Sequence, residues 1–137
     1  MKHFINLKDI PAHDLRKIIN NAKKSKDKRK KLSTLDVDNH SPLKGKLLIQ
    51  IFEKASLRTR LSFYLAIKQL GGGSLTVRPD ELHLSKGGES LADTAKILST
   101  YGNGFMLRTD SDAKLEEFKK YLTIPIINGL SPSSHPT

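Results

Sequence analysis

Residues 47–60 read LLIQIFEKASLRTR, a strand-like stretch that leads directly into the start of a helix. The nearly continuous apolar run from Lys46 to Phe52 is typical of a strand covered on both faces of a sheet. Two hydroxyls and two guanidinium groups follow within residues 56–60, Ser-Leu-Arg-Thr-Arg. Free backbone N–H groups and the positive end of a helix dipole converge at that point, and both attract an anion. The stretch therefore predicts a binding site for a phosphate-bearing ligand.

The segments around this stretch alternate between helical and strand-like patterns. Pro11 suits the first turn of a helix, and residues 71–73, three glycines, predict the end of the second helix. Ser90 and Asp93 resemble a capping box, and Pro125 indicates that the last strand lies at an edge or begins there. Apolar residues recur at helical spacing over 15–22, 63–70, 91–98 and 115–122, and short apolar runs stand at 74–77, 104–107 and 124–127.

This alternation predicts the fold class. Strands that alternate with helices form a parallel sheet with helices on both of its faces. We therefore expect an α/β fold, a three-layer sandwich with a central parallel four-stranded sheet. A chain of 137 residues has the length of one domain and can bury a real core, so we expect a single domain over residues 1–137.

Composition restricts the class of protein further. The chain has no cysteine, which excludes disulfides and thiolate-ligated metals. No apolar run approaches the ~20 residues of a membrane span. Residues 1–9 lack the apolar core of a signal peptide. We therefore expect a cytoplasmic protein without a membrane partner.

The charge is concentrated in one segment. The net charge is +10, and residues 23–31 hold seven basic residues and one aspartate. Such a run belongs either to a solvated helix end or to a surface that binds nucleic acid. Cations suit the C-terminal end of a helix, and no aromatic residue interrupts the run to stack on bases. We favour the solvated helix end, with a basic nucleic-acid-binding module as the alternative.

Polar residues follow all four predicted strands at their carboxyl ends. Residues 56–60 follow the first strand, and His83 to Glu89 follow the second. Arg108 ends the third strand, and Asn128 and His135 follow the fourth. Ligands of open α/β sheets bind at this edge. We therefore expect these groups to converge on one ligand.

Individual residues at this edge also have ordinary interpretations. Arg58 at the positive end of a helix is unfavourable unless an anion balances it. Arg108 directly after an apolar strand must either extend to water or find a partner. Thr59 also suits a helix N-cap, Arg60 suits a structural pair with a helix carboxylate, and His83 alone would be a solvated loop residue.

The same residues resemble a known family. Residues 52–60, F-E-K-A-S-L-R-T-R, followed by Ser62 and Phe63, resemble the carbamoyl-phosphate signature F-E-x-x-S-T-R-T-R-x-S-F of the carbamoyltransferases. Further matches follow in order and cover essentially the whole chain. Residues 88–94, 107–109, 124–130 and 135–137 resemble the family's G-E-S/T-x-x-D-T, M-R-T, V-P-V-I-N-A/G-L and H-P-C/T-Q.

The resemblance implies an activity and a set of site residues. In the family the δ-amine of ornithine attacks carbamoyl phosphate, which gives citrulline and phosphate without a metal or organic cofactor. The implied catalytic residues are Arg58, Arg108 and His135, which with Thr59 stabilise the oxyanion and the departing phosphate. The family's trimer brings the loop that holds His83 to a neighbouring subunit. The implied carbamoyl-phosphate site comprises Ser56, Leu57, Arg58, Thr59, His83, Arg108 and His135.

Ornithine and aspartate carbamoyltransferases share the phosphate signature. The opening residues 2–9, Lys54 and the Asn-Gly-Leu run at 128–130 resemble the ornithine enzymes. Lys86 to Glu89 looks more like the loop of the aspartate enzymes, which however usually have Arg-His where this chain has Arg-Thr at 108–109. We therefore favour ornithine as the acceptor, with aspartate as the alternative.

The chain departs from the family pattern in two ways. Leu57 stands where the family has threonine, which removes a hydrogen bond only if the threonine hydroxyl, and not its backbone N–H, holds the phosphate. The sequence stops at Thr137 and carries nothing that resembles the ornithine-binding second domain. We therefore expect an excised or truncated carbamoyl-phosphate-binding domain, which binds carbamoyl phosphate weakly and turns it over negligibly.

Overall fold

The computed structural model describes residues 3–82, 88 and 90–134 of the chain. Helices and strands alternate along these residues, as the sequence patterns predict. Short 3₁₀ turns lie at Leu7–Asp9, Arg29–Lys31 and Pro79–Leu82. The main elements are α1 (Ala12–Lys28), β1 (Leu47–Phe52), α2 (Leu57–Gln69), β2 (Gly73–Val77), α3 (Leu91–Tyr101), β3 (Gly104–Arg108), α4 (Asp112–Tyr121) and β4 (Ile126–Asn128).

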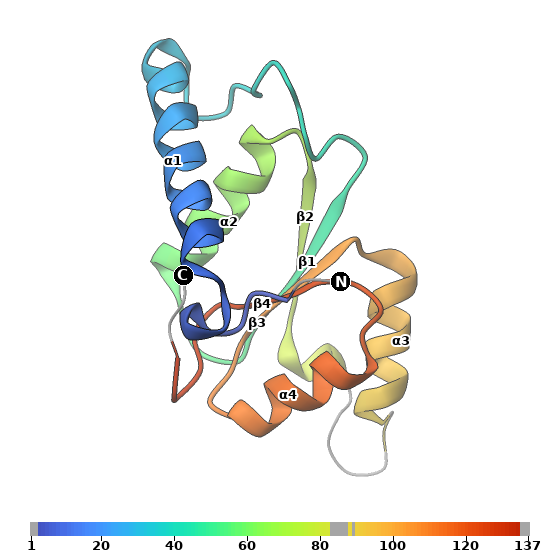
Figure 1. Cartoon of the computed structure of the whole chain (residues 1–137). Helices are drawn as coiled ribbons and strands as arrows, with labels where there is room; N and C mark the ends of the chain where they lie inside the picture. The colour runs from blue at the N-terminus through green and yellow to red at the C-terminus, as the bar shows by residue number, and fades with distance from the viewer. Residues whose placement is uncertain (1–2, 83–87, 89, 135–137) are drawn as a thin grey trace.

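The four strands form one parallel sheet in the order β2-β1-β3-β4. The chain first moves outward from β1 to β2 and then crosses back to place β3 on the other side of β1 (Figure 1). Such a reversal of strand order opens a crevice at the carboxyl ends of the two strands that flank it. The topology therefore points to the gap between β1 and β3 as the place for a ligand.

Helices cover both faces of the sheet and complete the predicted three-layer sandwich. On one face α3 and α4 pack against Ile49, Ile51 and Phe105, and the Phe105 and Phe118 rings lie 5.0 Å apart. On the other face α2 packs over a smaller cluster centred on Met106. Five consecutive residues of β1 are buried, as expected for a strand enclosed on both sides.

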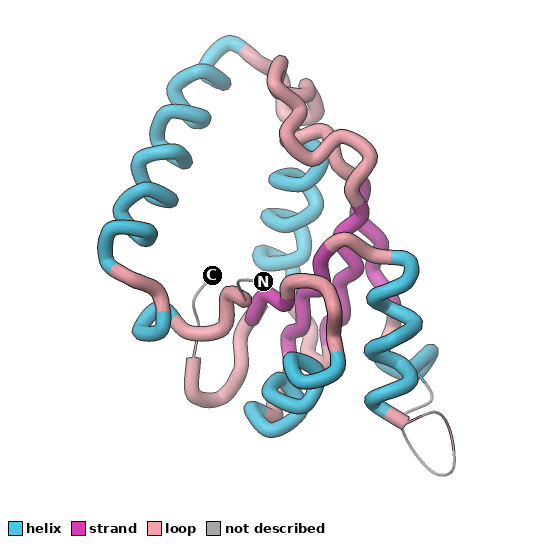
Figure 2. The backbone as a smooth tube through the Cα atoms, turned by 45° about the vertical axis from the view of Figure 1, so that its right-hand side comes forward, coloured by secondary structure: helices cyan, strands magenta, loops and turns pink. Residues whose placement is uncertain are grey.

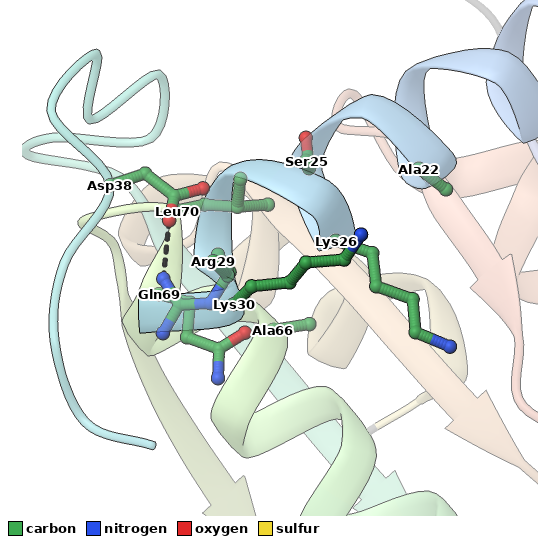
Figure 3. Close-up of a pocket in the computed structure, with 9 residues that line it drawn as sticks. All are labelled: Ala22, Ser25, Lys26, Arg29, Lys30, Asp38, Ala66, Gln69 and Leu70. Carbon is green, nitrogen blue, oxygen red and sulfur yellow. Dashed lines mark hydrogen bonds and ion pairs between the residues drawn. The ribbon is translucent and has the colours of Figure 1, made fainter. Parts of the chain in front are cut away.

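The helix α1 is the element least attached to this body. It has no buried residue, and Ile18 and Ile19 are about half exposed. Figure 2 shows the helix standing away from the sheet. A cavity of about 640 Å³ separates its C-terminal half from the end of α2, and Arg29 forms an ion pair with Asp38 in its wall (Figure 3). The helical spacing at 15–22 therefore predicts the helix correctly, although its apolar stripe is uncovered.

Local sequence signals fix several boundaries. Gly71 has a φ of 84°, and the N–H groups of Gly71 and Gly72 bond to the carbonyls of Lys68 and Ile67 at 3.0 and 2.9 Å. This pattern is a Schellman C-cap and confirms the predicted helix end. One half of the predicted capping box at the start of α3 is present, with a bond of 3.1 Å from the Asp93 N–H to Ser90 Oγ, and the Asp93 carboxylate accepts from the Ser90 hydroxyl at 2.6 Å.

The outer edge of β4 is partly covered by the N-terminal segment. β4 begins directly after Pro125 and is the last named strand of the sheet, as the proline predicts. Phe4 pairs with Ile127 in parallel, donating its N–H to the Ile126 carbonyl at 2.9 Å. In the described part of the chain, no helix is long and apolar enough to cross a membrane.

Candidate anion-binding site

A cleft of about 770 Å³ opens at the carboxyl ends of β1 and β3, where the reversal of strand order predicts one. We refer to it as the β1/β3 cleft. The loop after β1 and the first turns of α2 form one side of it, and the end of β3 and the loop after β4 form the other. Its walls consist of Ala55, Ser56, Leu57, Arg58, Thr59, Ser62, Arg108 and Leu130.

Arg108 reaches across this cleft from the end of β3. Its Nη1 donates to Ser56 Oγ at 2.6 Å and to Thr59 Oγ1 at 3.2 Å. Its Nε is buried and has no hydrogen-bond partner among the described residues. The contacts that hold this guanidinium are neutral hydroxyls, so its charge is left for an anion to balance.

The N-terminus of α2 differs from those of α3 and α4. In α3 and α4 the N-cap hydroxyls of Ser90 and Ser111 accept a hydrogen bond from their own helix. Ser56 is the N-cap of α2 but makes no capping bond, and the first turn holds no acidic residue. Among the described residues, the first N–H groups of α2 therefore have no capping side chain, and the Arg108 guanidinium bonds to the N-cap residue beside them.

The remaining residues of the 56–60 stretch have distinct environments. Arg58 lies in the first turn of α2, exposed and lining the cleft. Leu57 is 74% exposed at the cleft wall. Thr59 is not the N-cap, because the helix begins at Leu57. Arg60 has no carboxylate partner among the described residues; its guanidinium lies 5.1 Å from the centre of the Phe52 ring, so the predicted pairing is wrong.

The loop after β4 closes one wall of the cleft. The Asn128 side chain is buried; it donates to Ser131 Oγ at 3.0 Å and accepts from the Leu130 N–H at 3.0 Å. Leu130 has a φ of 134°, which is unusual for a residue with a side chain. Two predicted site residues, His83 and His135, lie outside the described residues.

The sequence patterns did not single out a polar network behind the cleft. Glu53 accepts hydrogen bonds from Thr109 Oγ1 and from Lys114 Nζ, the latter at 2.6 Å. Thr109 directly follows β3 and Lys114 lies on α4, and each is more than fifty residues from Glu53 in the sequence. The only available signal was the position of Glu53 inside the phosphate signature.

The similarity of this chain to known proteins extends over nearly its whole length. The family model "Aspartate/ornithine carbamoyltransferase, carbamoyl-P binding domain" matches residues 2–137. The chain belongs to the aspartate/ornithine carbamoyltransferase family. Within this family the ornithine carbamoyltransferase of Brucella ovis is 41% identical over 136 residues, which are 99% of this chain and 42% of that protein.

Solved structures of carbamoyltransferases share the fold. The ornithine carbamoyltransferase from Pyrococcus furiosus has a TM-score of 0.88 and 39% identity, over 98% of this chain and 41% of that one. The catalytic subunit of M. jannaschii aspartate transcarbamoylase has a TM-score of 0.82 and 34% identity, over 99% and 43%. The chain therefore spans less than half the length of these carbamoyltransferases and corresponds to the carbamoyl-P binding domain.

Proposed function

We propose that this chain is the carbamoyl-phosphate-binding half of an ornithine carbamoyltransferase, which transfers the carbamoyl group to the δ-amine of ornithine. The family and its carbamoyl-P binding domain support the first ligand. The observation that carries the proposal is the Arg108 guanidinium, held by Ser56 and Thr59 hydroxyls beside the uncapped start of α2. An oxyanion there would satisfy both the charge and the free N–H groups.

The proposed binding mode follows from the cleft walls. The phosphate binds at the N-terminus of α2, against Ser56, the Leu57 backbone N–H, Arg58 and Thr59. The carbamoyl oxygen points to Arg108, which with Thr59 and His135 stabilises the negative charge that develops when the amine attacks. Arg58 and Arg108 then neutralise the departing phosphate. The reaction needs no metal or organic cofactor in this proposal.

Ornithine is the proposed acceptor because relatives such as the Brucella ovis enzyme are ornithine carbamoyltransferases. The similarity to the M. jannaschii aspartate enzyme makes aspartate the second candidate. In this proposal, the residues that bind the amino-acid acceptor lie in the part of the relatives that this chain does not span. A steady-state assay of the full-length protein with each amino acid decides between the two.

The isolated chain should bind carbamoyl phosphate and turn it over negligibly. Transfer requires the amine to be held against the carbonyl carbon, and this chain covers 42% of the Brucella ovis relative. We further propose that the complete enzyme is a trimer whose His83 loop enters a neighbouring site. Citrulline formation by the isolated chain at a rate near that of a complete enzyme would contradict this.

Thermal unfolding with and without carbamoyl phosphate tests the binding site. A ligand at 100 times its Kd stabilises the folded state by about 2.7 kcal/mol, and inorganic phosphate serves as a second probe. Arg58→Ala should abolish most of this stabilisation. Arg16→Ala, at an exposed arginine on α1, is the matched control and should preserve it. Equal stabilisation of the Arg58→Ala variant would argue against the site.

The same variants examine the nucleic-acid alternative. Within the basic run, Arg29 is committed to Asp38 and Lys30 lies 2.9 Å from Asp27, while the other lysines are exposed. A nucleic-acid-binding module would bind DNA or RNA with a steep dependence on salt, and Arg58→Ala would leave this affinity intact. Stabilisation by carbamoyl phosphate that Arg58→Ala removes, without nucleic-acid affinity, would exclude that alternative.

A further inference from the structure

Glu53 connects the two loops that form the β1/β3 cleft. It follows β1 directly, and its backbone N–H donates to the Arg108 carbonyl at 2.9 Å. Its carboxylate accepts from the Thr109 hydroxyl through one oxygen and from Lys114 Nζ, at 2.6 Å, through the other. The residue next to Arg108 and the first turn of α4 are thereby tied to the loop that carries Ser56.

The network is shielded and leaves little freedom to its members. The side chains of Glu53 and Lys114 are 15% and 32% exposed, and Thr109 is 3% exposed. The Thr109 hydroxyl accepts from the Ser111 N–H at 3.2 Å, so its single proton is directed to Glu53. Lys114 is in the first turn of α4, whose N-cap is Ser111. Each partner of the carboxylate is therefore fixed by a second contact.

Arg108 is consequently held at two points against the same loop. Its backbone carbonyl bonds to Glu53, and its guanidinium bonds to Ser56, three residues farther along. We propose that Glu53 is a positioning residue, whose carboxylate clamps Thr109 and Lys114 and so sets the distance between the Arg108 guanidinium and the N-terminus of α2. This inference rests on the proposed function, because it concerns the affinity of the same anion site.

The direction of one substitution separates positioning from a simple charge effect. Glu53→Gln removes a negative charge near the cleft, so a purely Coulombic role predicts tighter anion binding. The amide keeps an oxygen for Thr109 but no longer accepts from Lys114. A positioning role predicts weaker binding, because the Arg108 guanidinium and the N-terminus of α2 would no longer stand at the distance at which both contact the anion.

The experiment measures the Kd of carbamoyl phosphate by calorimetry for wild type, Glu53→Gln, Lys114→Met and the double variant. The two single variants should each bind about tenfold more weakly, and the double variant no worse than either, because all three break one clamp. The matched control is Lys54→Ala. It removes an exposed pair, Lys54 to Asp110 at 3.7 Å, that joins the same two loops, and it should leave the Kd unchanged.

A spectroscopic measurement gives a readout that general destabilisation would not produce. The exchange of the Arg108 Nε–H with solvent, followed by NMR under conditions where every variant is folded, should accelerate in Glu53→Gln and not in Lys54→Ala. The signal is assigned by its loss in Arg108→Lys. Thr109→Val provides a second break in the clamp if Glu53→Gln does not fold.

The outcomes distinguish this inference from the proposed function. If wild type binds carbamoyl phosphate and Glu53→Gln binds it equally or more tightly, the positioning role is wrong and the proposed function stands. If wild type does not bind, the proposed function fails, and the exchange rate of the Arg108 Nε–H still decides whether Glu53 holds that side chain. Faster exchange in Glu53→Gln supports the clamp, and unchanged exchange overturns it.

Discussion

The Nη1 atom of Arg108 lies 2.6 Å from Ser56 Oγ, across the gap between the ends of β3 and β1. This contact takes the N-cap hydroxyl of α2 away from the helix that it begins. The other two serine N-caps, Ser90 and Ser111, bond to their own helices. Serine is therefore the N-cap residue of all three helices, but it caps the helix in α3 and α4 and holds Arg108 in α2.

Alanine substitutions of two N-cap serines should affect different properties of the protein. Ser90→Ala removes the bond to the Asp93 N–H and should lower the free energy of unfolding by about 1 kcal/mol. Ser56→Ala removes no capping bond but does remove an acceptor of Arg108 Nη1, so it should weaken carbamoyl phosphate binding. Urea denaturation and calorimetry measure the two effects. Wild-type affinity for carbamoyl phosphate in Ser56→Ala, or a wild-type free energy of unfolding in Ser90→Ala, would contradict the assignment.

A lysine at position 108 should not preserve the affinity for carbamoyl phosphate. A lysine keeps the positive charge but lacks the planar set of donors that contacts two hydroxyls and leaves Nε for a ligand. We expect Arg108→Lys to remain folded and to bind carbamoyl phosphate roughly tenfold to a hundredfold more weakly. Titration calorimetry provides the Kd, and circular dichroism confirms the fold. Wild-type affinity in this variant would show that charge alone is sufficient.

The Leu57→Thr substitution asks whether a hydroxyl at this position contacts the phosphate. Leu57 is 74% exposed at the cleft wall, so the change should alter the free energy of unfolding by less than about 0.5 kcal/mol. A new hydrogen bond worth about 0.5–1.5 kcal/mol should lower the Kd of carbamoyl phosphate roughly two- to tenfold. An unchanged Kd would mean that only the backbone N–H of this residue binds the ligand.

Gly71 should be needed both for the C-terminal end of α2 and for the close approach of the backbone to Ser41. Gly71→Ala places a side chain at a φ of 84° and its Cβ 2.8 Å from Ser41 Cβ. The left-handed conformation alone costs about 1–2 kcal/mol, and the contact adds to it. Gly45→Ala, at a φ of 72° with no atom within 4 Å, isolates the conformational cost. Urea denaturation should show the larger loss for Gly71→Ala.

The pH dependence of stability should include a contribution from His3. Burial and, next, the charge of Lys119 lower the pKa of His3 below its ordinary value of 6.5, and its Nδ1 accepts from the Ile126 N–H at 3.3 Å. The neutral ring is therefore favoured in the folded state. As the pH falls below 6.5 the unfolded chain takes up a proton first, so the folded state loses stability.

Urea denaturation of wild type and His3→Gln between pH 5 and 7.5 measures the contribution of His3 to the pH dependence of stability. Glutamine retains an acceptor but does not titrate, so the difference in the free energy of unfolding between the two proteins should change as the pH falls. The change should disfavour wild type at the acidic end. A constant difference across the range would rule out the linkage.

The sequence predicts the sheet well, because its two central strands, β1 and β3, are short apolar runs enclosed on both faces. The expected strand at 104–107 differs by one residue from β3, Gly104–Arg108. The last strand is displaced from 124–127 to Ile126–Asn128, since Pro125 has no N–H for the ladder. The apolar runs locate these strands in the sequence. The error in the bounds of the last strand arises at Pro125, the single residue that interrupts its run.

The candidate site is predicted in part. The stretch at 56–60 and Arg108 are recognisable because they follow strands, and they line one cleft. The ion pair of Glu53 with Lys114 cannot be predicted in this way. Neither residue belongs to a periodic pattern of side chains, and sixty-one positions separate the two in the sequence. The uncovered stripe of α1 is also unpredictable, since helical spacing shows which residues share a face and not what that face meets.

The helix α1 connects two segments that are each fastened to the rest of the molecule. On one side Phe4 is bonded to the carbonyl and N–H groups of β4, and on the other the N–H groups of Asp38 and Leu43 bond to the end of α2. A protease that cuts within α1 would therefore leave two fragments that remain associated. Such a nicked protein should still migrate as one species on a native gel, with its cleft intact.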